Sequence, residues 1–380
     1  MKKILVVNTS YSQFGGEDSN IIDELNLLHK NFDVEYLEYK NSKRLNIFDL
    51  IAFFIGSNYL SNRLLKLKIK EFNPDVVYVH NTWFRANLGI FKILKKSNIK
   101  VLVKIHNFRY YCTRHFFIVG HLKSQNICKM CNLSKGKRIF NKYFQNSYLK
   151  SFFVIIYGKK YYKILKNYDF QLLVMTRFQR KILENLGFNS NNINIYFNPI
   201  NIIDGSFNSD SDYFVYAGRI STEKGTEELI NAFIEAKLEN VNLKLIGDGK
   251  NLKTLKDKYN FPNINFLGEL DNDSTLKIIK NARGVITATK MYEGQPRLLC
   301  EASSMKIPAV FPKFGGMSEF FPDDYEFKFE QYNYSDLSNK LIQLHEHKNI
   351  KDISNNVFDK ACSLFDEKIM VKKFFDILSK

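Results

Sequence analysis

The sequence predicts an α/β protein with two parallel β-sheets, one in each half of the chain. Short apolar and β-branched runs alternate with longer amphipathic stretches in both halves. This alternation is typical of parallel strands joined by crossover helices. The chain has 380 residues, more than one hydrophobic core usually serves, so two domains of roughly 150 to 200 residues are expected.

Buried strands are expected at intervals along each half. In the first half they are residues 4–7, 76–79, 101–105 and 172–174. In the second half they are residues 213–217, 243–246, 264–267, 285–288 and 309–311. A segment of small polar residues, 204–212, separates the two series and predicts a linker. We therefore expect a first domain over residues 1–205, a second over 206–362, and a terminal helix over 363–380 that packs back on the first domain.

The positive charge of the chain is confined to one region. The chain has 56 Lys and Arg against 39 Asp and Glu, a formal net charge of +17. Residues 76–168 contain nineteen Lys and Arg and no acid, so the rest of the chain is slightly negative. A localised positive field attracts phosphate groups, whether of nucleic acid, anionic lipid or a lipid diphosphate.

Cysteine content and apolar segments bear on the cellular compartment. Five cysteines are too few and too irregularly spaced for a disulfide framework in a chain of this length, which favours a reducing cytoplasm. Residues 1–9 lack the long apolar core of a signal peptide. The longest apolar segments are too short to span a bilayer, so membrane contact is expected to be peripheral.

A loop of the second half carries two cations at a useful spacing. Arg219 and Lys224 follow the strand expected at 213–217, between Gly218 and Gly225. Two such cations can converge on a diphosphate, arginine as a planar fork and lysine as a point charge. The alternative is a pair of solvated surface charges.

A glycine pair follows the first strand. Gly15 and Gly16 precede the start of an expected helix, where backbone amides can approach a phosphate. A tight turn is the alternative. The glycine pattern of a dinucleotide-binding fingerprint is absent from this position.

Two glutamates stand eight residues apart near Pro296, which suits the first turn of a helix. Glu293 then belongs to a loop and Glu301 to the helix. Helical spacing would separate them by about 12 Å along the axis. In enzymes that hydrolyse glycosides, the two catalytic carboxyl groups lie ~5 to 9.5 Å apart. Glu293 and Glu301 are therefore predicted to bind separate hydroxyl groups rather than to form such a pair.

Taken in order, these motifs resemble the retaining glycosyltransferases of the GT-B fold, specifically the large group 1 family of bacterial lipopolysaccharide, capsule and exopolysaccharide transferases. The resemblance covers almost the whole chain. It rests on the glycine pair, the loop 218–225, the Gly247-Asp248-Gly249 turn and the two glutamates. It implies two Rossmann-like domains facing across a cleft, and sugar transfer with retention and without a divalent metal.

The resemblance also implies roles for individual residues. It assigns catalysis to His106, Glu293, Arg219 and Lys224. In the family, the residues matching Arg219 and Lys224 hold the donor diphosphate, the one matching Glu293 contacts the donor sugar and the one matching Glu301 the ribose. The residues expected to bind the donor, a UDP or GDP sugar, are Gly15, Gly16, Gly218, Arg219, Lys224, Gly247, Gly249, Gly268, Glu269, Glu293, Gly294 and Glu301. No metal and no further cofactor are expected.

His106 follows the strand expected at 101–105 and matches the family histidine near the reacting sugar and acceptor. A lone histidine at a strand end is usually structural, but the match favours the catalytic interpretation. His80 resembles a second family position whose role is less defined. The family often has an acid after the histidine matching His106, whereas this chain has Asn107, so no acid is assigned.

Three cysteines lie in a basic insert of the first half. Cys112, Cys128 and Cys131 accompany His115 and His121, and a Cys-x-x-Cys pair with a third thiol can hold zinc tetrahedrally. The fourth ligand is ambiguous. We therefore expect unmetallated thiols, with a structural zinc as the alternative.

Residues 60–72 predict a basic amphipathic helix. One stripe holds Leu60, Leu64 and Leu67, and another holds Arg63, Lys66 and Lys70. Such a helix suits an anionic membrane surface, while an ordinary helix over the core is the alternative. Residues 135–166, with nine cations and no acid, favour the membrane interpretation.

The sequence therefore predicts a retaining, metal-independent bacterial glycosyltransferase of surface polysaccharide biosynthesis, such as capsule or O-antigen. It is expected to use a nucleotide sugar and a saccharide or lipid-diphosphate-linked acceptor, in the cytoplasm at the inner face of the cell membrane. One alternative is a basic nucleic-acid-binding protein with stacking aromatics, which leaves the loops of the second half unexplained. The other is a catalytically silent sugar-nucleotide-binding relative, against which the retained motif residues argue.

Overall fold

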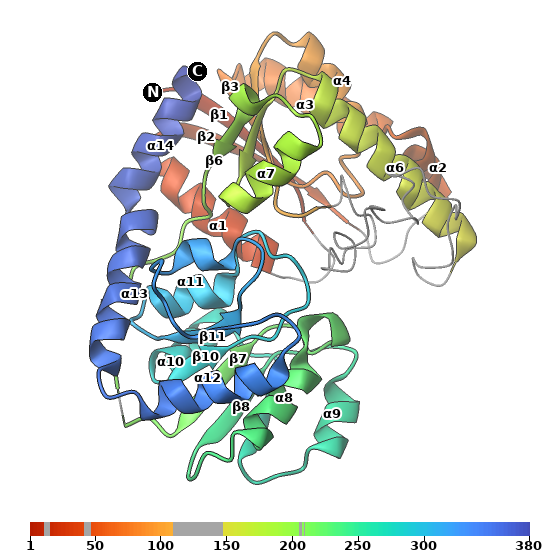
Figure 1. Ribbon diagram of the computed structural model, residues 1–380. Coiled ribbons are helices and arrows are strands. Elements are labelled where there is room, and N and C mark those ends of the chain that lie inside the picture. The colour runs from red at the N-terminus through yellow and green to blue at the C-terminus, as the bar shows by residue number, and fades with distance from the viewer. Residues whose placement is uncertain (11–15, 42–46, 109–146, 205–206, 209) are drawn as a thin grey trace. The chain divides into compact units, whose positions relative to one another are not determined.

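The computed structural model describes residues 1–10, 16–41, 47–108, 147–204, 207–208 and 210–380, and contains two six-stranded sheets (Figure 1). The chain divides into two compact units. The first comprises Met1–Pro199 with Val371–Lys380, and the second Ile200–Met370. The boundary at Pro199 precedes the polar segment 204–212 in which we expected the linker.

The first sheet has the order β2-β1-β3-β4-β5-β6, with every neighbouring pair parallel. Its strands are β1 (Lys3–Ser10), β2 (Asp33–Lys40), β3 (Val76–Val79), β4 (Lys100–Lys104), β5 (Gln171–Val174) and β6 (Ile193–Ile195). The four expected strands are present, and β2 and β6 are additional. These two lie at the edges, where β2 alternates buried and partly exposed positions and β6 is only three residues long, so neither presents a continuous apolar run.

The helices of the first unit connect these strands. They are α1 (Gly16–His29), α2 (Ile47–Ile55), α3 (Tyr59–Phe72), α4 (Gly89–Lys96), α6 (Tyr148–Asn167) and α7 (Arg177–Asn185), joined by the last part of α14 (Glu367–Ser379). Strand order reverses at β1, since β2 lies on one side of it and β3 on the other. Right-handed crossovers then place α1 and α3 on opposite faces of the sheet.

The second sheet has the order β12-β11-β10-β7-β8-β9. Its strands are β7 (Tyr213–Ala217), β8 (Asn242–Ile246), β9 (Ile264–Gly268), β10 (Gly284–Ile286), β11 (Ala309–Pro312) and β12 (Lys328–Phe329). All five expected strands are present. The helices are α8 (Thr226–Glu235), α9 (Leu252–Lys258), α10 (Asn272–Lys280), α11 (Arg297–Ser303), α12 (Tyr334–Glu346) and α13 (Ile350–Phe365).

Threonine is a preferred N-cap residue and acids favour the first turn of a helix, so the sequence predicts Thr226 as the cap of α8, followed by Glu227 and Glu228. Gly225, with a left-handed φ of 67°, is the N-cap, and Thr226 is the first helical residue. The Thr226 hydroxyl accepts a hydrogen bond from the Ser221 amide at 3.4 Å. The expectation that Glu227 and Glu228 occupy the first turn is confirmed.

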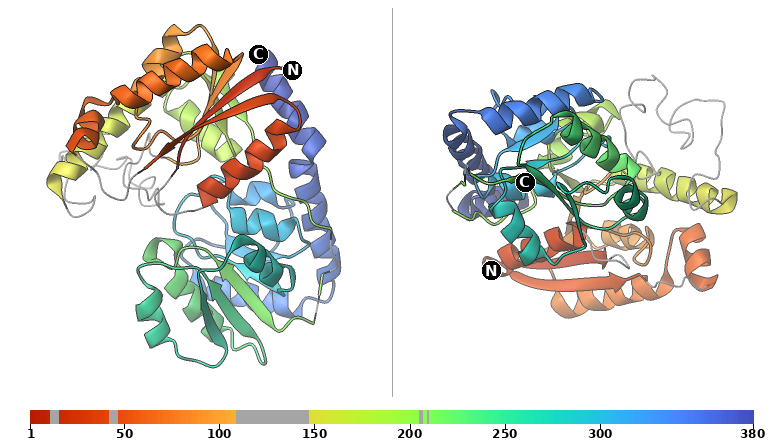
Figure 2. Two further views of the ribbon diagram at one scale, coloured as in Figure 1. Left: turned by 180° about the vertical axis from the view of Figure 1, so that it is seen from behind. Right: turned by 90° about the horizontal axis from the view of Figure 1, so that it is seen from below.

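The end of the chain packs into the first unit. Phe374 is fully buried, and its ring lies 5.2 to 5.6 Å from those of Phe32, Tyr78 and Tyr196. Lys2 Nζ donates a hydrogen bond to the carbonyl of Leu378 at 3.3 Å, so the two ends of the chain lie side by side (Figure 2, left). Residues far apart in the sequence thus share one core.

We predict that Phe374→Ala lowers the free energy of unfolding of the first unit by about 3–5 kcal/mol, because it leaves a cavity under three aromatic rings. Denaturant titration measures this loss. Phe375→Ala is the matched control, since that side chain is 42% exposed and its loss should cost much less. Equal losses in the two variants would show that the terminal segment does not complete the core.

Candidate functional site

The second sheet reverses its strand order between β7 and β10. From β7, the strands β8 and β9 follow on one side, and β10, β11 and β12 on the other. Ligands of open α/β sheets bind outside the carboxyl ends of the strands at such a reversal. The loop after β7 carries Arg219 and Lys224, and the loop after β10 carries Glu293. The predicted donor residues therefore come from both sides of this point.

Glycines allow the loops after β7 and β8 to touch backbone to backbone. A Cβ on Gly247 would lie 2.1 Å from the Gly218 carbonyl oxygen, and one on Gly249 would lie 2.2 Å from that of Ile220. The amide of Gly218 donates to Ile246 O at 2.9 Å, and that of Ile220 to Asp248 O at 2.9 Å. No side chain fits at either glycine, so this edge is lined by main chain.

A third close approach joins the β7 loop to β10. A Cβ on Gly225 would lie 2.0 Å from the Ala288 carbonyl oxygen, and its φ of 67° is left-handed. The amide of Lys290 donates to Glu223 O at 3.0 Å in the same place. The two loops that flank the reversal point are therefore fixed to each other.

This arrangement brings Lys224 and Glu293 together. Lys224 Nζ lies 2.6 Å from Glu293 Oε1, with 21% and 20% of the two side chains exposed. The Thr289 hydroxyl donates to the same carboxylate oxygen at 3.1 Å. A cation and a hydroxyl thus hold Glu293 in one orientation at the strand ends.

Arg219 has a fixed main chain and a solvated side chain. The buried Tyr216 hydroxyl donates to Arg219 O at 2.8 Å, and burial raises the pKa of Tyr216 well above its usual range. The guanidinium is 58% exposed and lies 3.6 Å from Glu223. An exposed, anchored arginine can reach a phosphate at little desolvation cost.

Glu301 lies on α11 and Glu293 in the preceding loop, as the sequence predicted. Arg297 Nε donates to Glu301 Oε1 at 2.6 Å, one helical turn away. Pro296 is the N-cap of α11 rather than a residue of its first turn. Arg297 was not among the predicted site residues. Its spacing of four residues from Glu301 nevertheless indicates that the two can form an ion pair on one face of a helix.

The remaining predicted donor residues lie in three places: the loops of the second unit, helix α1 of the first unit, and a segment outside the described residues. Gly268 ends β9 with a left-handed φ of 75°, and Glu269 follows it as an exposed residue. Gly294 is in the loop before α11. Gly16 begins α1 of the first unit, with open space where a Cβ would stand. Gly15 falls outside the described residues.

The first unit has a pocket at the ends of β3 and β4. Its lining comes from the segments after the two strands and from one face of α6. The lining residues are His80, Asn81, Thr82, Trp83, Lys104, Ile105, His106, Asn107, Tyr157 and Tyr161. Both histidines matched by the family resemblance therefore line one pocket.

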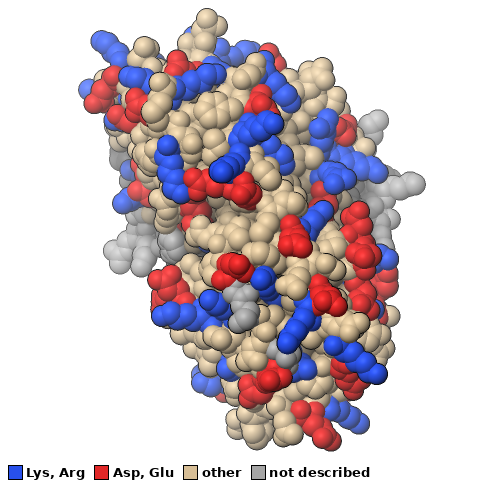
Figure 3. Space-filling model, turned by 90° about the vertical axis from the view of Figure 1, so that its left-hand side faces the viewer, with Lys and Arg blue, Asp and Glu red and all other residues tan. Residues whose placement is uncertain are grey.

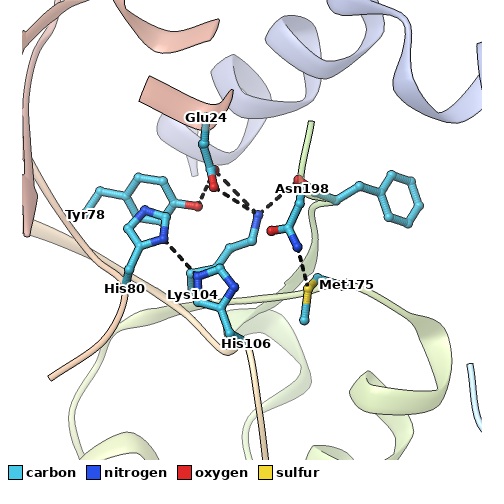
Figure 4. A network of polar contacts seen from close by, with 8 residues as sticks. Glu24, Tyr78, His80, Lys104, His106, Met175 and Asn198 are labelled. Carbon is cyan, nitrogen blue, oxygen red and sulfur yellow. Dashed lines mark hydrogen bonds and ion pairs between the residues drawn. The ribbon is translucent and has the colours of Figure 1, made fainter. Parts of the chain in front are cut away.

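The two histidines form a direct pair (Figure 4). His80 Nδ1 and His106 Nε2 are 2.9 Å apart, and the rings stack with centroids 5.2 Å apart. Burial, then His106, then Lys104 lower the pKa of His80 well below its usual range. His80 is therefore neutral at physiological pH, and the pair can donate at one ring nitrogen and accept at another.

A buried ion pair lies beneath the histidines. Lys104 and Glu24 are each 1% exposed, with Nζ 3.5 Å from both carboxylate oxygens (Figure 4). The Tyr78 hydroxyl donates to Glu24 at 2.6 Å, and Lys104 also donates to Phe197 O at 3.0 Å. Burial lowers the pKa of Lys104 to about 8 and raises that of Glu24.

The ion pair was not predicted from the sequence. The only signal for Lys104 is a charged residue inside an otherwise apolar strand, and Glu24 looks like any helical glutamate until the fold is known. The cysteine cluster with His115 and His121 falls outside the described residues. Among the residues that are described, no group of three metal-ligating side chains comes together.

We predict that Lys104→Met lowers the free energy of unfolding by about 3–5 kcal/mol, because it leaves Glu24 buried without its cation. Adding Glu24→Gln should recover much of this loss, since the buried charge is then removed. A double-mutant cycle by denaturant titration measures the coupling, with Lys92→Met, an exposed lysine, as control. Strictly additive losses would contradict the pairing.

Comparison with known proteins finds a family match for the second unit. Residues 199–359 match the family model described as glycosyl transferases group 1. An amylovoran biosynthesis glycosyltransferase, AmsD of Erwinia amylovora, is 28% identical over 130 residues, 33% of this chain and 37% of that protein. An uncharacterised glycosyltransferase of Methanocaldococcus jannaschii is 26% identical over 254 residues, 65% of this chain and 57% of that protein. The chain thus spans less than two thirds of the length of either relative.

Solved structures support the fold over the full length. HepE of Anabaena, crystallised in complex with UDP-glucose, superposes with a TM-score of 0.68 at 15% identity and covers 100% of both chains. The GT-B fold predicted from the sequence is confirmed. The family resemblance predicted from the sequence is supported as well, since residues 199–359 match the model of the glycosyl transferases group 1 family.

Proposed function

We propose that the chain is a glycosyltransferase that takes a sugar from a nucleoside-diphosphate sugar and adds it to an acceptor in polysaccharide biosynthesis. The observation that carries this proposal is the strand-end edge of the second unit. Glycine-bounded main chain lies there with Arg219 and with the Lys224–Glu293 pair. The name of AmsD and the UDP-glucose bound by HepE support both the pathway class and the donor class.

A diphosphate suits this edge chemically. Glycines keep side chains out of the loops at this edge, and Arg219 and Lys224 supply positive charge beside them. Lys224 Nζ already lies 2.6 Å from the Glu293 carboxylate. A phosphate that approaches Lys224 therefore becomes the second anion in contact with this ammonium group. Glu293 remains oriented by Thr289 and can accept hydrogen bonds from sugar hydroxyls. Glu301, one-eighth exposed, can bind the ribose hydroxyls in the same way.

The proposed reaction retains configuration at the anomeric carbon. The acceptor oxygen forms its bond to that carbon on the face from which the diphosphate leaves, and the acceptor proton passes to the departing phosphate oxygen. No protein nucleophile is assigned. Arg219 and Lys224 stabilise the charge that grows on the leaving group, the task that a divalent metal performs in other transferases.

The acceptor is proposed to bind at the histidine pocket of the first unit. His106 offers a hydrogen-bonding ring nitrogen, and Trp83, Tyr157 and Tyr161 supply aromatic walls. Aromatic faces with polar edges suit a saccharide, which has apolar C–H faces and hydroxyl rims.

We predict that Arg219→Ala and Lys224→Ala each cost ~2–4 kcal/mol of transition-state stabilisation while the fold survives, because each removes a charge-assisted phosphate contact. Steady-state kinetics with the best donor from a panel of nucleotide sugars measures the loss in kcat/KM. Lys253→Ala, an exposed lysine on α9, serves as control. Turnover near wild type in both site variants would exclude this edge as the diphosphate site.

We further propose that the acceptor is lipid-linked and that the chain acts in the cytoplasm at an anionic membrane face. The support is the acid-free segment 76–168, whose described part includes β3, β4, α4 and α6. Elsewhere the charges mix: Figure 3 shows a face on which Lys and Arg stand among Asp and Glu without a field of one sign. Within the described residues no helix is long and apolar enough to cross a bilayer. Nothing in the loops of the second unit favours the nucleic-acid alternative.

We predict that the wild-type protein sediments with anionic liposomes at low salt, is released at high salt and ignores neutral liposomes. Lys150→Glu, Lys159→Glu and Lys163→Glu together should abolish this binding. Lys160 and Lys166 are left intact because they donate to the backbone carbonyls of Phe54, Ile55 and Leu186.

The control reverses an equal charge on the second unit, at the exposed Lys253, Lys256 and Lys277. Donor-induced thermal stabilisation should persist in both variants. If the α6 variant binds anionic liposomes as well as the control does, the basic segment is not the docking surface.

A further inference from the structure

We infer that α2, the leucine stripe of α3 and the first turns of α6 form an apolar edge that inserts into the headgroup boundary of a lipid bilayer. This inference deepens the proposed membrane association, on which it rests, by adding hydrophobic insertion to electrostatic attraction. It concerns how the protein is held at the membrane and is independent of which sugar is transferred.

The leucine stripe of α3 faces solvent. Leu60, Leu64 and Leu67 are 66%, 45% and 54% exposed. The helix packs on its own unit through other positions, Leu65 and Phe72 among the buried ones. The helix therefore covers the core with one face, as an ordinary surface helix does, and presents the leucine stripe on another.

Helix α2 continues the apolar surface beside α3. Phe53 anchors α2, because its ring is buried and stacks on Tyr157 at 5.0 Å. Its neighbours Phe54 and Ile55 are 49% and 60% exposed. Only three residues separate α2 from α3, so the exposed end of α2 at Ile55 leads directly into the exposed start of the stripe at Leu60.

The first turns of α6 extend the surface on the other side of α2. Phe54 contacts the ring of Phe153 at 5.1 Å, and Lys160 Nζ donates to the carbonyls of Phe54 and Ile55. Near this contact, Leu149 is 63% and Phe152 41% exposed. Exposed apolar side chains of three helices thus form one edge of the first unit.

Charge identifies the partner. Arg63, Lys66 and Lys70 are exposed on α3 beside the leucines, and neither residues 59–70 nor 148–167 contain an acid. A second copy of the chain would place these cations against identical cations. An anionic bilayer offers both an apolar interior and negative headgroups, which is the environment of an interfacial amphipathic helix.

The test measures insertion separately from adsorption. Protein is injected beneath a phosphatidylglycerol monolayer held at constant area, and the rise in surface pressure reports insertion, while labelled protein reports adsorption. Wild type should adsorb and raise the pressure. A variant with Leu60→Ser, Leu64→Ser and Leu67→Ser should adsorb at low salt with little pressure rise. Its partition onto anionic liposomes should fall at least about tenfold, because each leucine kept from hydrocarbon contact is worth roughly that factor.

The matched control is Ile234→Ser, Phe261→Ser and Leu267→Ser on the second unit, where exposure is 38%, 49% and 38%. It should insert as wild type does. The inference is wrong if wild type adsorbs without raising the surface pressure. It is also wrong if the leucine variant inserts as well as the control does. Either result leaves electrostatic docking intact. No adsorption at all would refute the membrane proposal itself. If sedimentation equilibrium shows that the wild type dimerises and the leucine variant does not, the edge is a self-association surface instead.

Discussion

Three main-chain contacts at the edge of the second sheet admit no Cβ, and the candidate donor site depends on them. Gly247 meets Gly218, Gly249 meets Ile220, and Gly225 meets Ala288, each at a separation that only glycine permits. These contacts draw the loops after β7, β8 and β10 into one surface at the point where strand order reverses. Lys224 and Glu293, 69 residues apart in the chain, are thereby placed 2.6 Å from each other. Main chain, rather than side chains, therefore occupies this edge.

The ion pairs of the second unit are partly exposed, whereas the Lys104–Glu24 pair of the first unit is buried. In the second unit the predicted site residues are partly exposed and meet as surface ion pairs, which a phosphate can join without a large desolvation cost. In the first unit the charges of Lys104 and Glu24 are buried and fully engaged with Tyr78 and Phe197. This buried pair lies near His80, which burial keeps neutral. In the proposed reaction, the cations of the second unit meet the leaving diphosphate, and the ring nitrogens of the histidine pair meet an acceptor hydroxyl group.

Much of this arrangement could be predicted from the sequence, because it depends on local patterns. Continuous apolar runs located nine of the strands, and ordered glycines and charges located the strand-end loops. The edge strands β2, β6 and β12 were missed, because β2 and β6 lack such a run and β12 is only two residues long. Thr226 was taken as a cap because threonine prefers that position, whereas Gly225 occupies it, held there by its approach to Ala288. The pairs Lys224–Glu293, His80–His106 and Lys104–Glu24 join separate strand ends or helices, so only the fold could reveal them. The leucine stripe of α3 was visible in the sequence, but its outward orientation was not.

The central claim is that the glycine-bounded edge of the second unit binds a nucleoside diphosphate. Hydrogen–deuterium exchange with and without UDP and GDP tests the location of binding directly, because it reports each segment separately. One of the two nucleotides should protect residues 218–225, 247–249 and 289–301, and should leave the segments of the histidine pocket unchanged. Protection confined to the first unit, or no protection by any nucleoside diphosphate at saturating concentration, would contradict the assignment.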